Sequence, residues 1–423
     1  MKIAVWHNLP SGGGKRALYH HVKGLLERGH VIEAWCPPTA DQTYLPLSEL
    51  VPERVVPMDW EPKTLAARLG QAPGPLPFTR RKLAAMDRHC RECAAQINDG
   101  GFDVLLANSS VLFGTSPIGR YVQTPRALYL QEPFRALYEA SPQLPWVALP
   151  DAGRLWTPRR VKATLKDLAE VQSARLQARE ELRDARAFDR LLVNSQFSRE
   201  SVLRAYNLSA RVCYLGIDTV LFQPSGRAKE PFVVGLGSIA PAKGIKLSVD
   251  AVAALGPNLR LPLVWIGNYS DPDYLAHIKD YAAQQGVDLQ IKVRVTDGEL
   301  VDLLSRAAVM LYTPRLEPFG FAPLEANACG TPVVAVAEGG VRETLQPGVN
   351  GTLVADDDPA ALGAALRPYL EDLRLAEQAG RTARQYVLDR WRWETAVQRL
   401  EEHLLSLAFP AEEPRRQGAM THA

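Results

Sequence analysis

The sequence predicts an α/β protein with two domains, each built on a parallel sheet. The chain has 423 residues, which is enough for two domains of ordinary size. Apolar runs at 3–6 and 310–312 are each followed by turn-forming residues and then by a helical pattern, at 16–28 and 319–329 respectively. Another apolar run follows each helical pattern, so both stretches are predicted to be strand–helix–strand units of a parallel sheet.

Composition and charge argue against several classes of protein. The formal net charge is +2, which gives the chain no overall attraction to nucleic acid. No apolar run is long enough to span a bilayer and no signal-peptide pattern precedes the first strand, so we expect a cytoplasmic protein. The spacing of Cys90 and Cys93 supplies too few ligands for a closed zinc site. The scattered set indicates reduced, packed thiols, namely Cys36, Cys90, Cys93, Cys213 and Cys329.

Two glutamates flank the start of the predicted helix at 319–329. Glu317 lies in the loop before this helix, Glu325 lies within it, and Gly330 closes it. In a parallel sheet, helices start at the carboxyl ends of the strands, where their free N–H groups and positive dipole attract phosphate. An ionised carboxylate accepts hydrogen bonds from sugar hydroxyls. The stretch is therefore predicted to bind a ligand that carries both phosphate and sugar.

The residues around these glutamates form a specific pattern. Seven residues separate Glu317 from Glu325, with Pro-Phe-Gly-Phe at 318–321 and Gly-Thr-Pro-Val-Val at 330–334. The pattern resembles the donor-site signature of retaining glycosyltransferases of family 4, the glycosyl transferases group 1. The glycine pair at 13–14 and the sequence Leu-x-x-Arg-Gly-His at 25–30 resemble the amino end of the same family.

The resemblance implies the GT-B fold, in which two Rossmann-like, doubly wound domains face a cleft. The first domain would bind the acceptor and is expected at 1–215, together with a returning helix at 393–407. The second domain would bind the nucleotide sugar and is expected at 216–392. Residues 408–423 are predicted to form a disordered tail.

The resemblance also assigns donor-site residues. Lys243 matches the lysine that holds the diphosphate, Glu325 would bind the ribose, and Glu317 with the backbone amides of 319–320 would bind the donor sugar. Ser238 stands where family members carry an arginine, and this change is expected either to weaken phosphate binding or to shift it to Lys243 and backbone amides, unless a nearby cation substitutes. The predicted donor-binding residues are Gly13, Gly14, Ser238, Lys243, Val293, Glu317, Phe319, Gly320, Phe321 and Glu325.

A second departure from the family lies beside the reacting sugar. Many members have a histidine after the strand predicted at 126–130, and this chain has Gln131 or Glu132 there. The predicted catalytic residues are Lys243, Glu317, Gln131 and Glu132. The sequence pattern identifies no residue as a nucleophile. This fits a retaining front-face substitution, in which the leaving phosphate takes the acceptor proton. The resemblance implies a hexosyltransferase that needs neither a metal nor a cofactor, and the acidic run at 356–358 is predicted to cap a helix that starts at Pro359.

Partners and rival functions complete the hypothesis. The resemblance implies a sugar linked to UDP or GDP as donor, a glycan or lipid-linked acceptor as in polysaccharide biosynthesis, and no nucleic acid. The arginine-dense stretch 154–190 is predicted to be a solvated helix face, on which Glu180, Glu181 and Asp184 alternate with the arginines. The alternative is a basic surface that rests on the inner face of an anionic membrane. Two rival functions are a nucleotide-sugar epimerase on the same fold and a non-catalytic partner subunit of a glycosyltransferase.

Overall fold

The chain divides into two compact units. The computed structural model describes residues 1–60, 76–140, 144, 146–147, 157–269, 271–355 and 357–410. Unit 1 comprises 1–192 and 397–423, and unit 2 comprises 193–396. The domain limits expected from the sequence, 1–215 and 216–392, stay a prediction. The predicted disordered tail lies, from residue 411 onward, outside the described residues.

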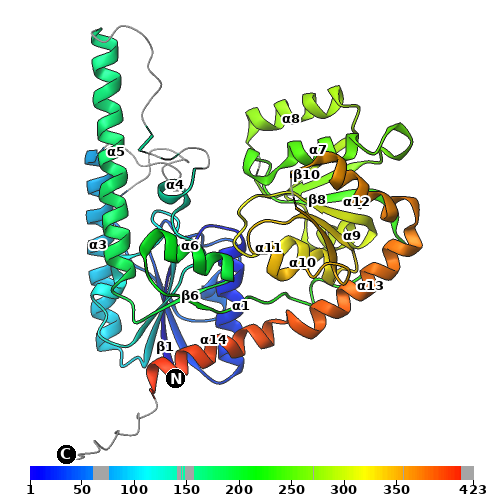
Figure 1. Cartoon of the computed structure of the whole chain (residues 1–423). Helices are drawn as coiled ribbons and strands as arrows, with labels where there is room; N and C mark the ends of the chain where they lie inside the picture. Colours follow the sequence, from blue (N-terminus) through cyan, green and yellow to red (C-terminus); the bar gives the residue numbers. More distant parts are fainter. Residues whose placement is uncertain are drawn as a thin grey trace, which may run out of the picture. The chain divides into compact units, whose positions relative to one another are not determined.

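Unit 1 is built around a parallel sheet with the strand order β3-β2-β1-β4-β5-β6 (Figure 1). The central residues Ile3, Val5 and Val104 are fully buried, as expected for a parallel sheet covered on both faces. The strands are β1 (Lys2–Asn8), β2 (Val31–Cys36), β3 (Glu53–Val55), β4 (Val104–Ser110), β5 (Arg126–Tyr129) and β6 (Arg190–Val193). The short strand β7 (Arg211–Val212) belongs to the segment of unit 2. The helices are α1 (Gly13–Glu27), η1 (Leu47–Glu49), α3 (Leu76–Asp99), η2 (Pro117–Arg120), α4 (Arg135–Tyr138) and α5 (Pro158–Ala185).

The last helix of the chain, α14 (Trp393–Ala408), packs on α1 through its residues in unit 1. Glu401 accepts hydrogen bonds from Arg28, with an Nε–Oε2 distance of 2.7 Å, and pairs with His30 at 2.7 Å. A Cβ on Gly24 would lie only 2.5 Å from Cγ2 of Val397, so the missing side chain at Gly24 permits this close packing.

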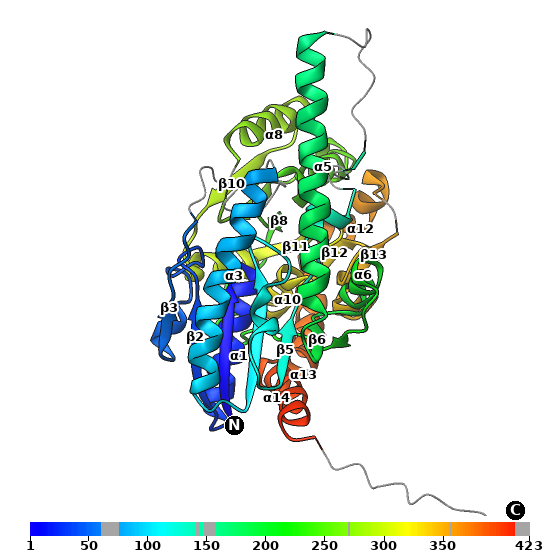
Figure 2. The same ribbon diagram turned by 90° about the vertical axis from the view of Figure 1, so that its left-hand side faces the viewer.

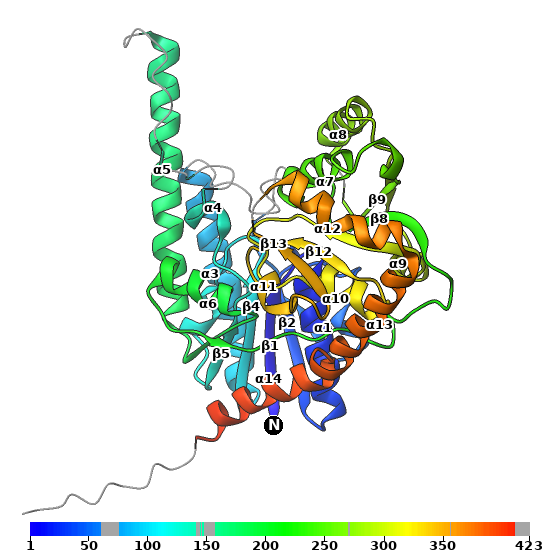
Figure 3. The same cartoon turned by 45° about the vertical axis from the view of Figure 1, so that its right-hand side comes forward.

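Unit 2 contains a six-stranded parallel sheet in the order β10-β9-β8-β11-β12-β13. Helices α7 and α12 cover one face (Figure 3). Their buried Val249 and Leu366 pack with Val309 and Val334 of the sheet. The strands are β8 (Glu230–Leu236), β9 (Leu263–Gly267), β10 (Leu289–Val293), β11 (Ala307–Tyr312), β12 (Val333–Val336) and β13 (Gly351–Val354). The helices are α6 (Gln196–Tyr206), η3 (Pro241–Lys243), α7 (Ile245–Ala253), η4 (Pro257–Leu259), α8 (Pro272–Gln284), α9 (Asp297–Arg306), α10 (Phe321–Ala328), α11 (Val341–Thr344), α12 (Pro359–Glu371) and α13 (Leu373–Arg390).

Two helix starts differ from the prediction. Gly13 and Gly14 lie in the first turn of α1, not in the loop before the helix, because the chain becomes helical directly after Gly12, whose positive φ of 137° favours glycine. The helix predicted at 319–329 starts later, at Phe321, because Gly320 has a left-handed φ of 100° that a helix interior does not allow. In both places the backbone amides of the predicted ligand site remain at or next to a helix N-terminus.

The predicted solvated face of α5 is wrong for two of its carboxylates. Glu181 is 1 % exposed and accepts a hydrogen bond from the backbone N–H of Gly114 at 3.1 Å. Asp184 is 4 % exposed and lies 3.0 Å from Nε of Arg120. These carboxylates are buried because α5 packs against α3 and η2 within unit 1.

Candidate donor site

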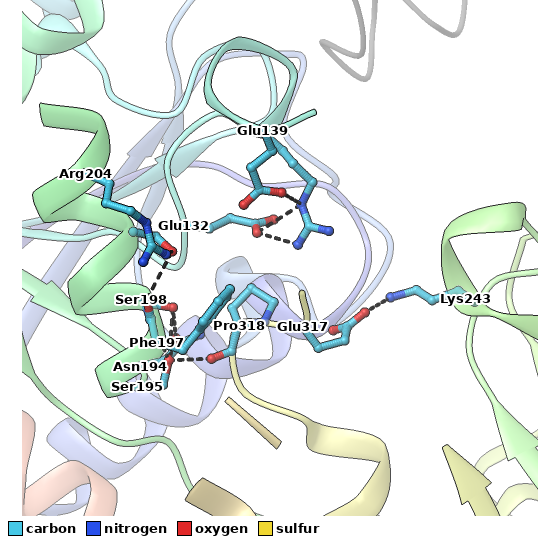
Figure 4. A network of polar contacts seen from close by, with 12 residues as sticks. Glu132, Glu139, Asn194, Ser195, Phe197, Ser198, Arg204, Lys243, Glu317 and Pro318 are labelled. Atoms are coloured by element: carbon cyan, nitrogen blue, oxygen red, sulfur yellow. Dashed lines mark hydrogen bonds and ion pairs between the residues drawn. The ribbon is translucent and has the colours of Figure 1, made fainter. Parts of the chain in front are cut away.

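Lys243 and Glu317 are ion-paired with each other in unit 2 (Figure 4). Lys243 is the last residue of η3, just before α7, and Glu317 lies in the loop between β11 and α10. Both side chains are partly accessible, at 28 % and 18 % respectively. The structure therefore brings together the two residues predicted to bind the diphosphate and the donor sugar.

Thr313 holds the two loops together. Its hydroxyl donates to the carbonyl oxygen of Gly244 at 2.9 Å and contacts Oγ of Ser248 at 2.8 Å. Gly244 has a φ of 69°, and a Cβ there would lie 2.5 Å from the carbonyl oxygen of Thr313. Only glycine permits both this φ and this approach. The sequence pattern had not singled out Thr313, and its position directly after a buried strand is the signal that can identify it.

A glycine pair supports the loop that carries Glu317. The backbone N–H of Gly340 donates to the carbonyl oxygen of Glu317 at 2.8 Å, and a Cβ on Gly339 would lie 2.4 Å from the same oxygen. Leu316 adopts a left-handed φ of 54° directly before Glu317. Non-glycine residues with such angles are uncommon and concentrate where surrounding structure holds a functional loop.

The two helices beside this ion pair have no side-chain cap. Gly244 precedes α7 and Gly320 precedes α10, and neither helix has an acidic residue in its first turn. The Lys246 N–H of α7 bonds to the Tyr274 hydroxyl, and the other first-turn N–H groups of these two helices are available to an anion. Other helices of unit 2 have caps from their own side chains: α6 by Ser195, α8 by Asp271, α9 by Thr296, α12 by Asp358 and α13 by Asp372. The predicted caps at Ser195 and Asp358 are confirmed, while Asp356 lies outside the described residues.

Glu325 lies on α10 and is 3 % exposed. Its carboxylate and that of Glu317 both act on Tyr312, the last residue of β11. Burial raises the pKa of the Tyr312 hydroxyl well above its usual value, and the two negative charges add to this shift. The two glutamates of the sequence pattern are therefore both close enough to the Tyr312 hydroxyl to act on it.

The aromatic rings of the pattern pack away into the fold. Phe319 is 3 % exposed, and its ring centroid lies 5.2 Å from that of Phe321 and 5.5 Å from that of Trp391. The ring of Phe321 lies 6.5 Å from that of Trp393. Since the rings are engaged with each other, the backbone amides at 319–321 are what this segment offers to a ligand.

Ser238 and Val293 occupy two further loops of unit 2. Ser238 follows Gly237. A Cβ on Gly237 would lie only 3.3 Å from Cδ of Lys243, so the aliphatic part of the lysine side chain lies over this glycine. Val293 ends the edge strand β10 and is 43 % exposed. No described contact joins Val293 to the Lys243–Glu317 pair. The nearby Arg315 does not replace the missing arginine at 238, because it is bound to Glu338 and Asp357.

The remaining predicted residues lie in unit 1. A Cβ on Gly14 would lie 2.9 Å from Nε2 of Gln131, so the Gln131 amide packs against the first turn of α1. Glu132 instead accepts hydrogen bonds from Arg135, the shorter at 2.6 Å, and Arg135 also pairs with Glu139 at 3.3 Å (Figure 4). Of the two residues considered as replacements for the family histidine, Gln131 is the one that contacts the glycine pair.

One group of described residues has the ligand atoms for a metal ion. His7, Cys36 and Glu53 place one nitrogen, one sulfur and one oxygen within 4.8 Å of one another at the carboxyl edge of the unit 1 sheet. Nε2 of His7 lies 2.8 Å from Oε1 of Glu53, and the thiol of Cys36 lies 3.6 Å from that oxygen. The buried ammonium of Lys15 acts on Glu53 and already balances its charge. The cluster is therefore neutral without a metal, and it is separate from the residues predicted to bind the donor.

Part of the chain matches a family model and several known proteins. Residues 218–386 match the family model described as "Glycosyl transferases group 1". A D-inositol 3-phosphate glycosyltransferase from Catenulispora acidiphila is 30 % identical over 44 % of this chain and 50 % of its own length. A GDP-mannose-dependent phosphatidylinositol monomannoside mannosyltransferase from Mycolicibacterium smegmatis is 30 % identical over 50 % of this chain and 60 % of its own length. The chain thus aligns with about half to three fifths of each relative.

The fold also matches solved structures. Anabaena HepE in complex with UDP superimposes with a TM-score of 0.67 at 20 % identity, covering 96 % of this chain and 100 % of that protein. The predicted architecture of two Rossmann-like domains with the GT-B fold is confirmed. Among the described residues, no helix has the length and apolar character of a membrane span.

Proposed function

We propose that this chain, whose residues 218–386 match the model of the glycosyl transferases group 1, belongs to that family and is a retaining glycosyltransferase. It moves a hexosyl group from a nucleotide-diphosphate sugar to a hydroxyl group of a glycan or a lipid-linked glycan precursor. The observation that carries the proposal is the Lys243–Glu317 pair, which lies between two uncapped helix N-termini.

Each part of the donor has a proposed partner. The ammonium of Lys243 and the first amides of α7 and α10 bind the diphosphate, because cations and helix N-termini both favour phosphate. Glu317 accepts hydrogen bonds from the donor sugar, and Glu325 accepts them from the ribose. Val293, exposed at the end of β10, borders the nucleobase, and the amides of the glycine pair at 13–14 are also proposed as donor-binding groups.

The proposed reaction needs no nucleophilic side chain. The bond between the anomeric carbon and the diphosphate oxygen breaks, and the acceptor oxygen bonds to the same face of that carbon. The acceptor proton passes to the departing phosphate oxygen, so charge and atoms balance. Lys243 and the helix amides stabilise the negative charge that grows on the leaving group. Gln131 is proposed to orient the reacting sugar, in place of the histidine found in related enzymes.

Two features of the relatives support the choice of substrates. The mycobacterial relative is named for GDP-mannose and a phosphatidylinositol acceptor, and the Anabaena structure contains UDP. We therefore propose UDP- or GDP-sugars as donors and an acceptor that can carry a lipid. The exposed arginines of α5 are proposed to give peripheral contact with anionic lipid at the cytoplasmic face of a membrane.

The proposal is tested by incubating the protein with UDP- and GDP-sugars and candidate acceptors, with and without a chelator. We expect transfer that persists in the chelator, and an α-linked product from an α-linked donor, as measured by the proton coupling of the anomeric centre. An inverted product, or activity lost in chelator and restored by manganese, contradicts the proposed mechanism. Conversion of the donor sugar with no acceptor present would identify an epimerase instead.

A further inference from the structure

A groove runs between α3, α5 and η2 in unit 1, apart from every residue assigned to the donor. Its cavity volume is about 490 Å³, within the range of sites for small organic ligands. One wall is apolar and contains Leu76, Leu83, Met86, Phe113 and Leu176. An open apolar cavity of this size is suited to an aliphatic or aromatic group.

The other wall of the groove has an excess of positive charge. Five arginines line it, Arg80, Arg91, Arg120, Arg179 and Arg183. Three carboxylates oppose them, Asp87, Glu180 and Asp184. Two positive charges therefore remain when every carboxylate is ionised. A phosphate monoester at neutral pH carries a charge of about −1.5 to −2, which matches this excess.

The arginines differ in how firmly they are held. Arg120 is 16 % exposed and lies within 3.0 Å of both Asp87 and Asp184, so its charge is already paired within unit 1. The side chains of Arg179 and Arg183 are 71 % and 66 % exposed, and both share the single carboxylate of Glu180. These two guanidinium groups are therefore the ones that a ligand can recruit at little cost.

The apolar wall continues beyond the groove along the same face of α5. Leu176 lies in the groove, Leu168 lies two helical turns before it, and Leu165 and Val161 follow at spacings of three and four residues toward the N-terminus, which places the four on one side of the helix. The three are 44 %, 61 % and 59 % exposed. The N-terminal part of α5 extends past the end of α3 (Figure 2), so α3 does not cover this stripe.

We propose that this groove binds a single-chain alkyl phosphate, with the phosphate between Arg179 and Arg183 and the chain along the aliphatic stripe. The order of the residues used here supports this orientation, since Arg179 and Arg183 lie C-terminal to Leu176 on α5, and Leu168, Leu165 and Val161 lie N-terminal to it. From Leu176 to Val161 the helix rises by roughly 22 Å, which gives an extended chain an apolar path. The site uses no residue of the donor site, so the inference stands apart from the proposed transferase activity.

The test compares three probes by isothermal titration calorimetry with the full chain, at concentrations below micelle formation. Dodecyl phosphate has both chain and charge, dodecyl maltoside has the chain alone, and butyl phosphate has the charge with a short chain. We expect dodecyl phosphate to bind at least tenfold more tightly than either of the others. Equal affinity for the two dodecyl compounds, or for the two phosphates, overturns the proposal, as does the absence of dodecyl phosphate binding.

Variants locate the site. The double change Arg179→Gln and Arg183→Gln should weaken dodecyl phosphate at least tenfold and leave dodecyl maltoside unchanged, while Leu165→Gln with Leu168→Gln should weaken both. All four positions are exposed, so the fold should persist. Matched controls are Arg81→Gln, an exposed arginine of α3 outside the groove, and Leu203→Gln, a leucine of α6 that is 54 % exposed. Controls that weaken binding as much as the groove variants would refute the assigned location.

Discussion

Lys243 and Glu317, 74 residues apart in the chain, are each other's ion-pair partner. The sequence pattern had assigned them separately to the diphosphate and the donor sugar. Their pairing means that an incoming diphosphate has to replace a carboxylate as the partner of the lysine. Donor binding at this site is therefore an exchange of one anion for another, followed by a new role for Glu317 as an acceptor of sugar hydroxyls.

Neutralising Glu317 should separate these two roles. Glu317→Gln leaves Lys243 without its carboxylate, so affinity for free UDP or GDP should stay equal or rise, up to about fivefold given the partial exposure of the pair. Transfer of the sugar should fall, because the amide is a weaker acceptor for sugar hydroxyls. Calorimetry and turnover measure the two effects. Lys243→Ala should lower the affinity for free nucleotide. Lys246→Ala, which removes an exposed lysine of α7 that pairs with Asp250, should leave this affinity unchanged. A loss of nucleotide affinity in Glu317→Gln would contradict the exchange.

The role of Glu325 should be detectable through its effect on ribose binding. Glu325→Ala should cost about 1–3 kcal/mol of nucleotide affinity, because it leaves a ribose hydroxyl unpaired. As the side chain is buried, Glu325→Gln is the gentler change. The wild-type protein should prefer a ribonucleoside diphosphate over its 2′,3′-dideoxy form, and the variant should lose most of that preference. A preference that persists in the variant would remove Glu325 from the ribose site.

Gln131 and Glu132 should differ sharply in their effect on turnover. Gln131→Ala should lower turnover by about 5–150-fold, the cost of one lost hydrogen bond at the reacting sugar. Glu132→Gln should have little effect on turnover, because its carboxylate is bound to Arg135. Steady-state kinetics with one donor decides between them. If only Glu132→Gln lowers turnover, the roles of the two residues are reversed.

The backbone pattern was the part of the fold that the sequence could predict. The apolar runs, the glycine closures and the caps at Ser195 and Asp358 all depend on residues close in sequence, and each is found. The contact of Gly244 with Thr313 could not be predicted, because 69 residues separate them and neither has unusual chemistry. The burial of Glu181 and Asp184 was missed for a similar reason. A charged residue on an amphipathic helix is usually exposed, and only the packing of α3 and η2 on α5 shows otherwise.

Asp184 should make stability depend on pH. Burial raises its pKa to about 7 even though Arg120 is adjacent, because Arg120 is shared with Asp87 and Glu180, and the charges of Glu180, Glu181 and Asp87 also oppose ionisation. In the unfolded chain an aspartate ionises near pH 3.9. Between these values the native state holds one proton more than the unfolded state, so the free energy of unfolding should fall as pH rises from about 4 to 7.

Asp184→Asn should remove this cost. Denaturant unfolding at pH 8 should show the variant to be more stable than wild type by a few kcal/mol, and this advantage should shrink through pH 5 and nearly vanish at about pH 4. Asp87→Asn is the matched control. Burial opposes ionisation of Asp87, but hydrogen bonds from Tyr121 and Arg91 and the charge of Arg120 outweigh it and lower its pKa. That variant should be less stable than wild type at pH 8. A stabilised Asp87→Asn, or a destabilised Asp184→Asn, would contradict the assignment of charge in this cluster.

Replacing Gly244 should cost more stability than its left-handed backbone angle alone explains. It has a φ of 69°, and Gly348, in a turn of the same unit, has a φ of 75°. An alanine at either position adopts a left-handed conformation at a cost of about 1–2 kcal/mol. At Gly348 the new Cβ meets no atom within 4 Å, but at Gly244 it lies 2.5 Å from the carbonyl oxygen of Thr313. Gly244→Ala should therefore lose more stability than Gly348→Ala in denaturant unfolding. It should also weaken nucleotide binding, because the loop that carries Lys243 has to move away from β11. Equal losses of stability, with nucleotide affinity unchanged in both variants, would show that the contact with Thr313 does not position the lysine.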